Sequence, residues 1–355
     1  MSKTKKIILT GGGTAGHVSP NLALVPSLRQ AGWQVAYIGS QVGIEAQLVG
    51  DAGIPYYGIS SGKLRRYFDW QNFSDPFKVI KGLADAYFLL GELQPDLVFS
   101  KGGFVTVPVI LASWLRRIPT IIHESDFTPG LANKISLPFA TKVCVTFPET
   151  LNQLPQAIWT GLPIRAEILQ GDQHKGNLLC GFSQALPILL VMGGSLGSAR
   201  INQSIRGILP DLLTRYQVVH LCGAGNLAPD LTGLPGYIQF EYLKAELADV
   251  MAIADLVVSR AGANAVFELL ALRKPNLLIP LSQQSSRGDQ ILNANSFAQS
   301  GFSQVLVEED LNPESLSQAI ANLDVNQKNI VVKMAANQAS SSIHKIMEVI
   351  SQFGE

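Results

Sequence analysis

Glycine-rich turns that could hold a phosphate occur three times, at residues 11–16, 100–108 and 193–197. Each follows a short apolar run and leads into an amphipathic stretch. Such a turn presents backbone N–H groups at the positive end of a helix dipole, and glycine lets a ligand approach the backbone closely. An ordinary strand–helix turn has the same composition. Three of them at the carboxyl ends of predicted strands, shared between two halves of the chain, favour anion binding.

A sharper pattern lies in the second half, where residues 254–272 are predicted as a strand, a turn of small residues and a helix. Glu268 lies about one and a half turns into that helix. Its carboxylate can accept hydrogen bonds from the two hydroxyls of a ribose, although a solvated helix glutamate gives the same pattern. Asp289 and Gln290 begin a later helix, where they can bind sugar hydroxyls or cap the helix. These side chains favour a nucleotide sugar as ligand.

Two common phosphate-binding folds fit the sequence less well. Residues 11–16 match G-x-G-x-x-G, but a dinucleotide-binding domain places Asp or Glu at the end of its second strand to hold the ribose. Here the apolar run 35–38 is followed by Gly39 and Ser40, which disfavours a nicotinamide-dependent dehydrogenase. No G-x-x-x-x-G-K-[ST] motif occurs, which argues against a P-loop enzyme.

The elements that position these turns predict two α/β domains. Continuous apolar runs alternate with helical stretches, a pattern typical of parallel strands that are covered on both faces. The runs lie at residues 7–9, 35–38, 97–99, 120–122, 142–145, 188–191, 218–221, 256–258 and 276–279. Proline and glycine near residue 161 mark the boundary. We expect two Rossmann-like, doubly wound domains facing a cleft: residues 1–161 with the last helix, about 341–355, and residues 162–340.

Composition narrows the class of protein. The chain has 355 residues, of which 47% are hydrophobic, and its formal net charge is zero, so no basic footprint for nucleic acid spans the protein. Cys144, Cys180 and Cys222 form no C-x-x-C pair and fit a reducing compartment. No apolar run reaches the ~18 residues of a membrane span. The basic start leads into a strand and is not expected to be a signal sequence.

Together the motifs resemble the peptidoglycan N-acetylglucosaminyltransferases of glycosyltransferase family 28. The similarity extends from Gly11 to about Leu306 and rests, in order, on the Gly-Gly-Thr-x-Gly-His-Val loop, the Lys-Gly-Gly-Phe loop, the His-Glu pair, the Gly-Gly-Ser loop and the Ser-Arg-Ala-Gly…Glu helix. The resemblance implies the GT-B architecture. It also implies inverting transfer of N-acetylglucosamine from UDP to the 4-hydroxyl of a muramyl-pentapeptide carried on undecaprenyl diphosphate, which converts lipid I into lipid II.

The resemblance further implies contacts for individual residues. Those expected at the substrates are Thr14, Ala15 and Gly16 in the first loop, Asp126, Arg165 and Ser195 at the sugar or diphosphate, Leu243 near the uracil, Ala263, Asn264 and Glu268 in the nucleotide helix, and Asp289 and Gln290 at the donor sugar. Three positions depart from the family pattern: Ala15 replaces a glycine, Asp126 an asparagine and Leu196 a glutamine. An alanine at position 15 requires a negative φ, and an ionised Asp126 offers only acceptors.

The implied reaction needs a base and stabilisation of charge. No Asp-x-Asp motif occurs, so we expect no metal and no other cofactor. Helix N-termini, Arg165 and Ser195 would stabilise the leaving diphosphate. His17 is the expected general base, because an imidazole with an ordinary pKa of ~6.5 is mostly neutral at neutral pH. Donation by His17 to the acceptor diphosphate is an alternative, and His123 and Glu124 are other candidate bases.

A lipid acceptor requires contact with the cytoplasmic face of the membrane, where we expect a peripheral protein. Basic side chains beside exposed apolar ones suit an anionic bilayer, although an amphipathic helix packed on the core gives a similar pattern. The candidate residues are Lys63, Arg65, Arg66, Trp70, Phe73, Phe77, Lys78, Ile80, Lys81, Leu83, Trp114, Arg116 and Arg117.

Other functions remain compatible with the same motifs. A UDP-sugar epimerase or a different glycolipid transferase would share the fold and the nucleotide site. A non-catalytic subunit that binds sugar nucleotides would share them too. Loss of turnover in His17→Ala with UDP affinity retained would exclude the non-catalytic alternative.

Overall fold

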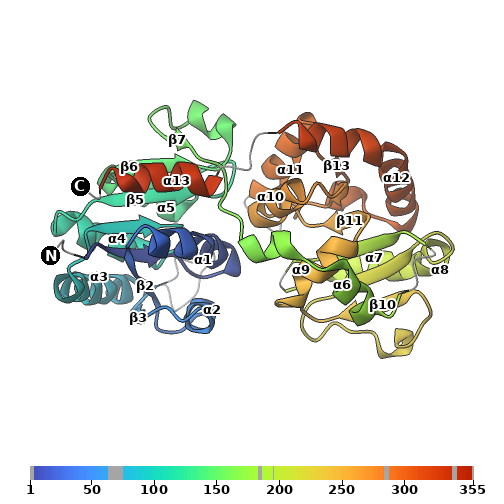
Figure 1. Cartoon of the computed structure of the whole chain (residues 1–355), viewed down its shortest axis with the longest axis horizontal. Coiled ribbons are helices and arrows are strands. Elements are labelled where there is room, and N and C mark those ends of the chain that lie inside the picture. Colours follow the sequence, from blue (N-terminus) through green and yellow to red (C-terminus); the bar gives the residue numbers. More distant parts are fainter. Residues whose placement is uncertain are drawn as a thin grey trace. The chain divides into compact units, whose positions relative to one another are not determined.

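The computed structural model describes residues 4–62, 75–182, 186–194, 196–283, 288–337 and 342–353. The chain divides into two units, which we call unit 1 (residues 1–165 and 341–355) and unit 2 (residues 166–340). Each unit contains one parallel sheet with helices around it (Figure 1). None of the described helices is both long and apolar enough to cross a bilayer.

The sheet of unit 1 has the strand order β3-β2-β1-β4-β5-β6-β7, and every neighbouring pair is parallel. Its strands are β1 (Lys6–Thr10), β2 (Gln34–Ser40), β3 (Tyr56–Ile59), β4 (Leu97–Ser100), β5 (Thr120–Glu124), β6 (Lys142–Val145) and β7 (Ile158–Trp159). Its helices are α1 (Ala15–Gln30), α2 (Ile44–Asp51), α3 (Asp75–Leu93), α4 (Thr106–Leu115), α5 (Leu131–Ser136) and α13 (Ser342–Ser351).

Strand β1 shows why this sheet is covered on both faces. Ile7 and Leu9 lie in a buried cluster with residues of α1 and α13, whereas Ile8 lies in a second cluster with residues of α3 and α4. Successive side chains of a strand point to opposite faces, so an unbroken apolar run supplies both clusters. The C-terminal helix α13 therefore completes the core of unit 1.

The sheet of unit 2 repeats this order as β10-β9-β8-β11-β12-β13, again with parallel pairs throughout. Its strands are β8 (Ile188–Met192), β9 (Gln217–Leu221), β10 (Tyr237–Phe240), β11 (Leu256–Ser259), β12 (Asn276–Leu278) and β13 (Gln304–Val305). Its helices are α6 (Gln173–Cys180), α7 (Ala199–Gly207), α8 (Leu209–Leu212), α9 (Glu246–Ile253), α10 (Ala263–Ala271), α11 (Asp289–Gln299) and α12 (Pro313–Ala335).

The predicted fold class is confirmed: both units are doubly wound α/β structures, and all nine predicted apolar runs are strands. Sequence reasoning missed β3, β7, β10 and β13. These are short strands near the sheet edges, and most of their residues are only partly buried. In each sheet the chain order reverses beside the first strand, between β1 and β4 and between β8 and β11. Open α/β sheets bind ligands at this switch point, on the carboxyl edge.

Candidate functional site

The two glycine loops of unit 1 meet at its switch point. Gly12 N–H donates to the Gly102 carbonyl over 3.3 Å, and Lys101 N–H donates to Thr10 over 2.9 Å. A Cβ atom at Gly103 would lie 2.3 Å from the Gly12 carbonyl oxygen, so this approach requires glycine. The loops predicted from widely separated segments therefore form one surface at the carboxyl ends of β1 and β4.

His17 lies in the first turn of α1, partly buried, beside the first glycine loop. Its Nδ1 lies 3.0 Å from the Gly12 carbonyl oxygen and 3.3 Å from the Thr14 hydroxyl. A carbonyl can only accept, so Nδ1 donates to Gly12 and carries the hydrogen of the neutral ring. The lone pair of that tautomer is on Nε2. The arrangement can thus accept a proton at Nε2.

Ala15 has the negative φ that an alanine at this position requires. It is the first residue of α1, with Thr14 as the N-cap, and the positive φ of this loop falls on Gly13 (+85°) instead. A methyl group at position 15 is therefore compatible with the backbone. Gly16 follows it in the same helical turn.

His123 does not suit the role of general base. Its side chain is fully buried, with Nδ1 2.6 Å from Lys101 Nζ and Nε2 2.9 Å from the Gly161 carbonyl. Burial, and then the charge of Lys101, lower the pKa of His123 well below its usual range. Both ring nitrogens are engaged inside the protein. This candidate base from the sequence analysis is therefore corrected to a structural histidine.

Glu124 is likewise occupied by its own loop. Its carboxylate accepts hydrogen bonds from Asp126 N–H (2.9 Å), Gly130 N–H (2.9 Å) and the Asn133 amide (2.7 Å). Since the carboxylate is buried and holds three donors, it organises residues 125–130 and is a poor base. The partly buried Asp126 is anchored through its backbone.

Lys101 is a buried cation that the sequence did not reveal as unusual. Only 1% of its surface is exposed. Burial lowers the pKa of Lys101 to about 7, although Glu124 and Asp126 oppose the shift. The second glycine loop therefore begins on a residue that can lose its charge near neutral pH.

In unit 2 the loop after β8 leads into α7 at the switch point. Ser198 is the N-cap of α7 and accepts from Ile201 N–H over 3.4 Å. Gly197 has a φ of +75°, and a Cβ there would lie 2.0 Å from the Cys222 carbonyl, so this position requires glycine. Ser195, the expected phosphate-binding serine, lies outside the described residues. Leu196 is 86% exposed.

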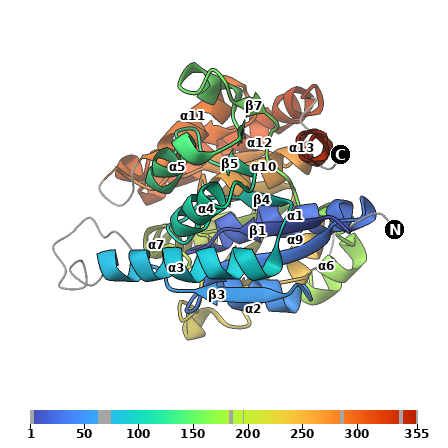
Figure 2. The ribbon, with the colours of Figure 1, turned by 90° about the vertical axis from the view of Figure 1, so that its left-hand side faces the viewer.

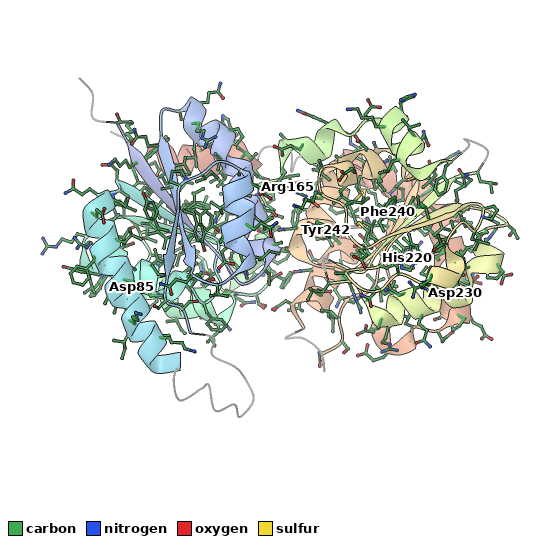
Figure 3. The ribbon with its side chains drawn as sticks, turned by 90° about the horizontal axis from the view of Figure 1, so that it is seen from below. Asp85, Arg165, His220, Asp230, Phe240 and Tyr242 are labelled. Atoms are coloured by element: carbon green, nitrogen blue, oxygen red, sulfur yellow. The ribbon has the colours of Figure 1, made fainter. Side chains whose placement is uncertain are left out.

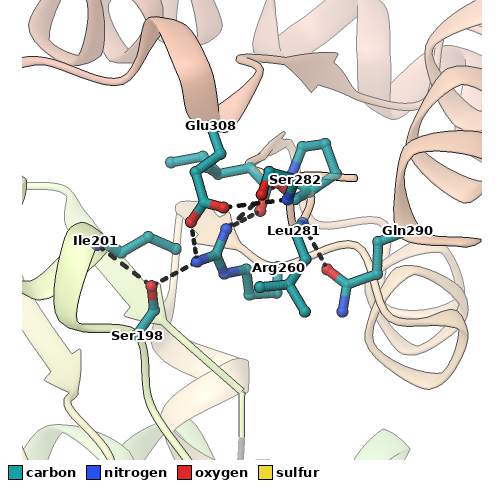
Figure 4. Close-up of polar contacts among 9 residues, drawn as sticks. Ser198, Ile201, Arg260, Leu281, Ser282, Gln290 and Glu308 are labelled. Atoms are coloured by element: carbon teal, nitrogen blue, oxygen red, sulfur yellow. Dashed lines mark hydrogen bonds and ion pairs between the residues drawn. The ribbon is translucent and has the colours of Figure 1, made fainter. Parts of the chain in front are cut away.

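Arg260 ties together the loops of this edge (Figure 4). Its guanidinium donates to the Ser198 hydroxyl (2.6 Å), to the Ile279 carbonyl (3.0 Å) and, in a short ion pair, to Glu308. Glu308 in turn accepts from Ser282 N–H over 3.1 Å. Burial raises the pKa of Glu308, but the hydrogen bonds from Arg260 and Ser282 outweigh this and leave it below its usual range.

The expected nucleotide and sugar residues lie on the neighbouring helices of unit 2. Ala263 begins α10 after Gly262, which has no side-chain cap, and Asn264 and Glu268 are partly buried farther along it. Asp289 begins α11, and the side-chain carbonyl of Gln290 accepts from Leu281 N–H over 3.1 Å. Leu243 is buried in the loop after β10.

The expected residues thus fall into one group in each unit. Unit 1 holds those of the first glycine loop together with Asp126 and Arg165, which is its last residue before unit 2 (Figure 3). Unit 2 holds the remaining described ones. Sequence reasoning missed Lys101, Arg260 and Glu308 as contributors; Arg260 stood inside a motif, but nothing in the sequence pointed to Glu308. Within the described ranges, no cluster of His, Cys, Asp and Glu could hold a metal ion.

Comparisons with known proteins match one family domain to each half of the chain, and the second match extends into α13, which belongs to unit 1. The glycosyltransferase family 28 N-terminal domain matches residues 7–145, and the glycosyltransferase family 28 C-terminal domain matches residues 188–350. A relative from Lachnospira eligens is 58% identical over 98% of both chains, and one from Geobacillus thermodenitrificans is 54% identical over 98% of both. Both are named UDP-N-acetylglucosamine–N-acetylmuramyl-(pentapeptide) pyrophosphoryl-undecaprenol N-acetylglucosamine transferase.

A solved structure gives the same result for the fold. The crystal structure of Acinetobacter baumannii MurG superposes with a TM-score of 0.76 at 25% identity, and the match covers 98% of this chain and 99% of that one. The two family domains together span both switch-point edges described above. The chain belongs to glycosyltransferase family 28.

Proposed function

We infer that this protein transfers N-acetylglucosamine from UDP-N-acetylglucosamine to the 4-hydroxyl of undecaprenyl-diphosphate-linked N-acetylmuramyl-pentapeptide, with inversion at the anomeric carbon. The observation that carries this inference is the 58% identity, over 98% of both chains, to a relative named for that transfer. The placement of the family's motifs at the two switch points supports it.

The reaction is a single displacement. The acceptor oxygen forms a bond to the anomeric carbon while the bond from that carbon to the UDP oxygen breaks, and its electron pair leaves with UDP. His17 Nε2 takes the proton of the attacking hydroxyl. The hydrogen bond from Nδ1 to Gly12 supports this role, because it leaves the lone pair of the neutral ring on Nε2. Of the three candidate bases, His17 is the one that is only partly buried.

The negative charge that develops on the leaving diphosphate must be stabilised by hydrogen-bond donors. Unit 2 offers the N-terminus of α10 after Gly262. The family resemblance adds Ser195 and Arg165 as expected donors. We do not count Arg260 among these donors, because Glu308 neutralises it and backbone and side-chain oxygens occupy its guanidinium.

The lipid acceptor places this activity at a membrane, and the described part of unit 1 offers a surface for it. Ile80 (65% exposed) and Phe88 (71%) lie on α3, and Trp114 (53%) lies on α4, which packs against α3 (Figure 2). Lys81 is exposed on α3, where its positive charge would be attracted to an anionic bilayer. Leu83 packs against the core, so it does not belong to the exposed patch that the sequence predicted.

Part of the expected membrane patch, residues 63–74 and the side chain of Phe77, lies outside the described residues. The proposed location is peripheral, on the cytoplasmic side, where the nucleotide donor and the lipid acceptor meet.

The direct test follows label from donor to lipid. The purified protein is incubated with UDP-N-acetylglucosamine labelled in the sugar and with a short-chain muramyl-pentapeptide diphospholipid. Label in the lipid product, with one UDP released per sugar transferred, is the expected result. Folded protein that binds UDP but leaves the lipid unlabelled would refute the proposed function. Label recovered in a free epimeric sugar would point to the epimerase alternative.

A further inference from the structure

A buried carboxylate lies beneath the first glycine loop of unit 1. Glu45, near the start of α2, has no exposed surface. One carboxylate oxygen accepts from Ser40 N–H (3.1 Å) and, in a short contact, from the Ser40 hydroxyl. The other accepts from Gly13 N–H over a long 3.4 Å. No Lys or Arg of the described ranges forms an ion pair with Glu45, so these dipolar groups support its charge in place of a cation.

The surrounding backbone makes room for this carboxylate. A Cβ atom at Gly12 would lie 2.6 Å from Glu45 Oε1, one at Gly43 would lie 2.4 Å from Oε2, and one at Gly39 would lie 2.9 Å from Cγ. Glycines at these positions allow the backbone to close around Glu45. The first glycine loop therefore packs directly on the Glu45 carboxylate. A side chain of different length or charge at position 45 should shift this loop.

One peptide group connects Glu45 to His17. The Gly13 N–H that donates to Glu45 and the Gly12 carbonyl that accepts from His17 Nδ1 (3.0 Å) belong to the same peptide unit. A negative charge at the N–H end of a peptide strengthens its carbonyl as an acceptor, because hydrogen bonds in series polarise one another. The chain of contacts thus runs from carboxylate through peptide to imidazole.

We propose that Glu45 is a positioning residue for His17, acting through the Gly12–Gly13 peptide. It holds the carbonyl that fixes the Nδ1–H tautomer, and its charge stabilises the imidazolium that forms when Nε2 takes the acceptor proton. The proton remains on His17 until solvent removes it. This inference rests on the proposed function, since it requires that His17 act as the base.

Among the titratable groups nearby, Lys101 on the neighbouring glycine loop can lose its charge near neutral pH. Wild type and Glu45→Gln both contain Lys101, so the test reads the difference between the two proteins. Burial, together with the charge of Glu45, raises the pKa of Tyr37 and of Tyr56 above the usual range, so both phenols stay neutral in any practical assay. Helix α13 packs against α1, and its charged side chains have partners of their own. Lys345 lies over the ring of Trp159, and His344 pairs with Glu348.

The test compares Glu45→Gln with wild type in the transfer assay. We expect kcat to fall about tenfold, with KM for UDP-N-acetylglucosamine unchanged because the nucleotide motifs belong to unit 2. The acid limb of the kcat/KM profile should move to lower pH, because an imidazolium without a nearby carboxylate is less stable. Asp51→Asn, at the exposed far end of the same helix, is the control and should retain wild-type values.

A double variant separates positioning from general damage. If Glu45 acts through His17, Glu45→Gln should slow the His17→Ala enzyme no further, and Glu45→Asp should restore part of kcat. The proposal would be overturned if Glu45→Gln lowered kcat equally in the wild-type and His17→Ala enzymes. It would also be overturned if the acid limb of the kcat/KM profile did not move.

Nitrogen NMR of the histidine rings gives a readout that needs no turnover. We expect His17 to hold its proton on Nδ1 in wild type, and its pKa to fall in Glu45→Gln. An Nε2–H tautomer in wild type would overturn the inference even if Glu45→Gln failed to fold. If wild type transferred no sugar, the proposed function would fail instead, and the tautomer and pKa would still decide whether Glu45 acts on His17.

Discussion

The carboxyl edges of the two sheets share a topology and differ in chemistry. The edge of unit 1 carries two groups that can gain or lose a proton: the imidazole of His17 and the amine of Lys101. The edge of unit 2 carries the ion pair of Arg260 with Glu308, whose carboxyl has a lowered pKa and stays ionised at neutral pH. One fold, used twice, thus supplies an edge suited to proton transfer and an edge with fixed charge and open helix N-termini, suited to an anion.

The largest expected effect removes His17, the proposed proton acceptor of unit 1. His17→Ala should lower kcat by about 10²–10⁴, because no other candidate base is placed to replace it. The dissociation constant for UDP, measured by titration calorimetry, should stay within about twofold, since the nucleotide motifs are in unit 2.

His344→Ala is the matched control, because His344 is 75% exposed and pairs only with Glu348 among the described residues. It should retain wild-type turnover. Equal loss of UDP binding and of turnover in His17→Ala would contradict the assignment of proton transfer to unit 1 and of nucleotide binding to unit 2.

The next effect removes the ion pair of unit 2. Arg260→Met leaves Glu308 buried without its cation and should destabilise unit 2 by about 3–5 kcal/mol. The affinity for UDP should fall as well, because the loop between β8 and α7, where we propose that phosphate binds, loses the contact at Ser198. All four tryptophans lie in residues 1–165, so their fluorescence follows unit 1 alone, whereas calorimetry follows both units.

We therefore expect the calorimetric transition of unit 2 to move down while the fluorescence transition stays near its wild-type midpoint. Adding Glu308→Leu should recover much of the loss, because the double variant leaves no unpaired charge. A fluorescence midpoint that falls as far as the calorimetric one would show that Arg260 does not act locally.

The third effect is the pH dependence of unit 1. The pKa of Lys101 is about 7 in the folded chain, below its ordinary value of 10.5. Between these values the unfolded chain binds more protons, so the free energy of unfolding should rise with pH, by at most about 1.4 kcal/mol per pH unit. This contribution is complete above the unfolded pKa and is lost as the pH falls through the folded one.

Lys101→Met should flatten that slope, measured by denaturant titration of tryptophan fluorescence from neutral to mildly alkaline pH. Lys81→Met, on the exposed face of α3, should leave it unchanged. An unchanged slope in Lys101→Met would mean that the edge of unit 1 does not titrate through this amine.

The smallest effect concerns the exposed apolar side chains. Ile80→Ser with Phe88→Ser should weaken binding to vesicles of phosphatidylglycerol about tenfold, since each side chain enters the interface only in part and contributes a fraction of the about 1.5–3 kcal/mol of full burial. Co-sedimentation at two salt concentrations would measure this loss and the contribution of the basic residues. Val325→Ser, an 85% exposed valine on α12 of unit 2, is the control and should bind as wild type. Equal loss in the control would place the membrane surface elsewhere.

Much of the fold could be read from the sequence because both sheets are parallel and buried. Runs such as 188–191 are apolar at every position, since both faces of the strand pack under helices. The short strands β3 and β13 escaped prediction because most of their residues are only partly buried and their polar or glycine content resembles that of a loop. The glycine loops, the start of α10 with Glu268, and His17 could be singled out as candidates for the same local reason: a strand, a turn and a helix follow one another in the chain.

The sequence by itself determined which segments are strands, where the loops must be glycine-rich, and which residues stand first in the helices that follow. Only the tertiary structure decided what those residues can do. It buried His123 against Lys101, neutralised Arg260 with Glu308, and placed Glu45 behind the peptide that binds His17. The physical reason is that proton affinity and charge depend on burial and on partners that lie 22 to 48 residues away in the chain, and no local pattern encodes such partners.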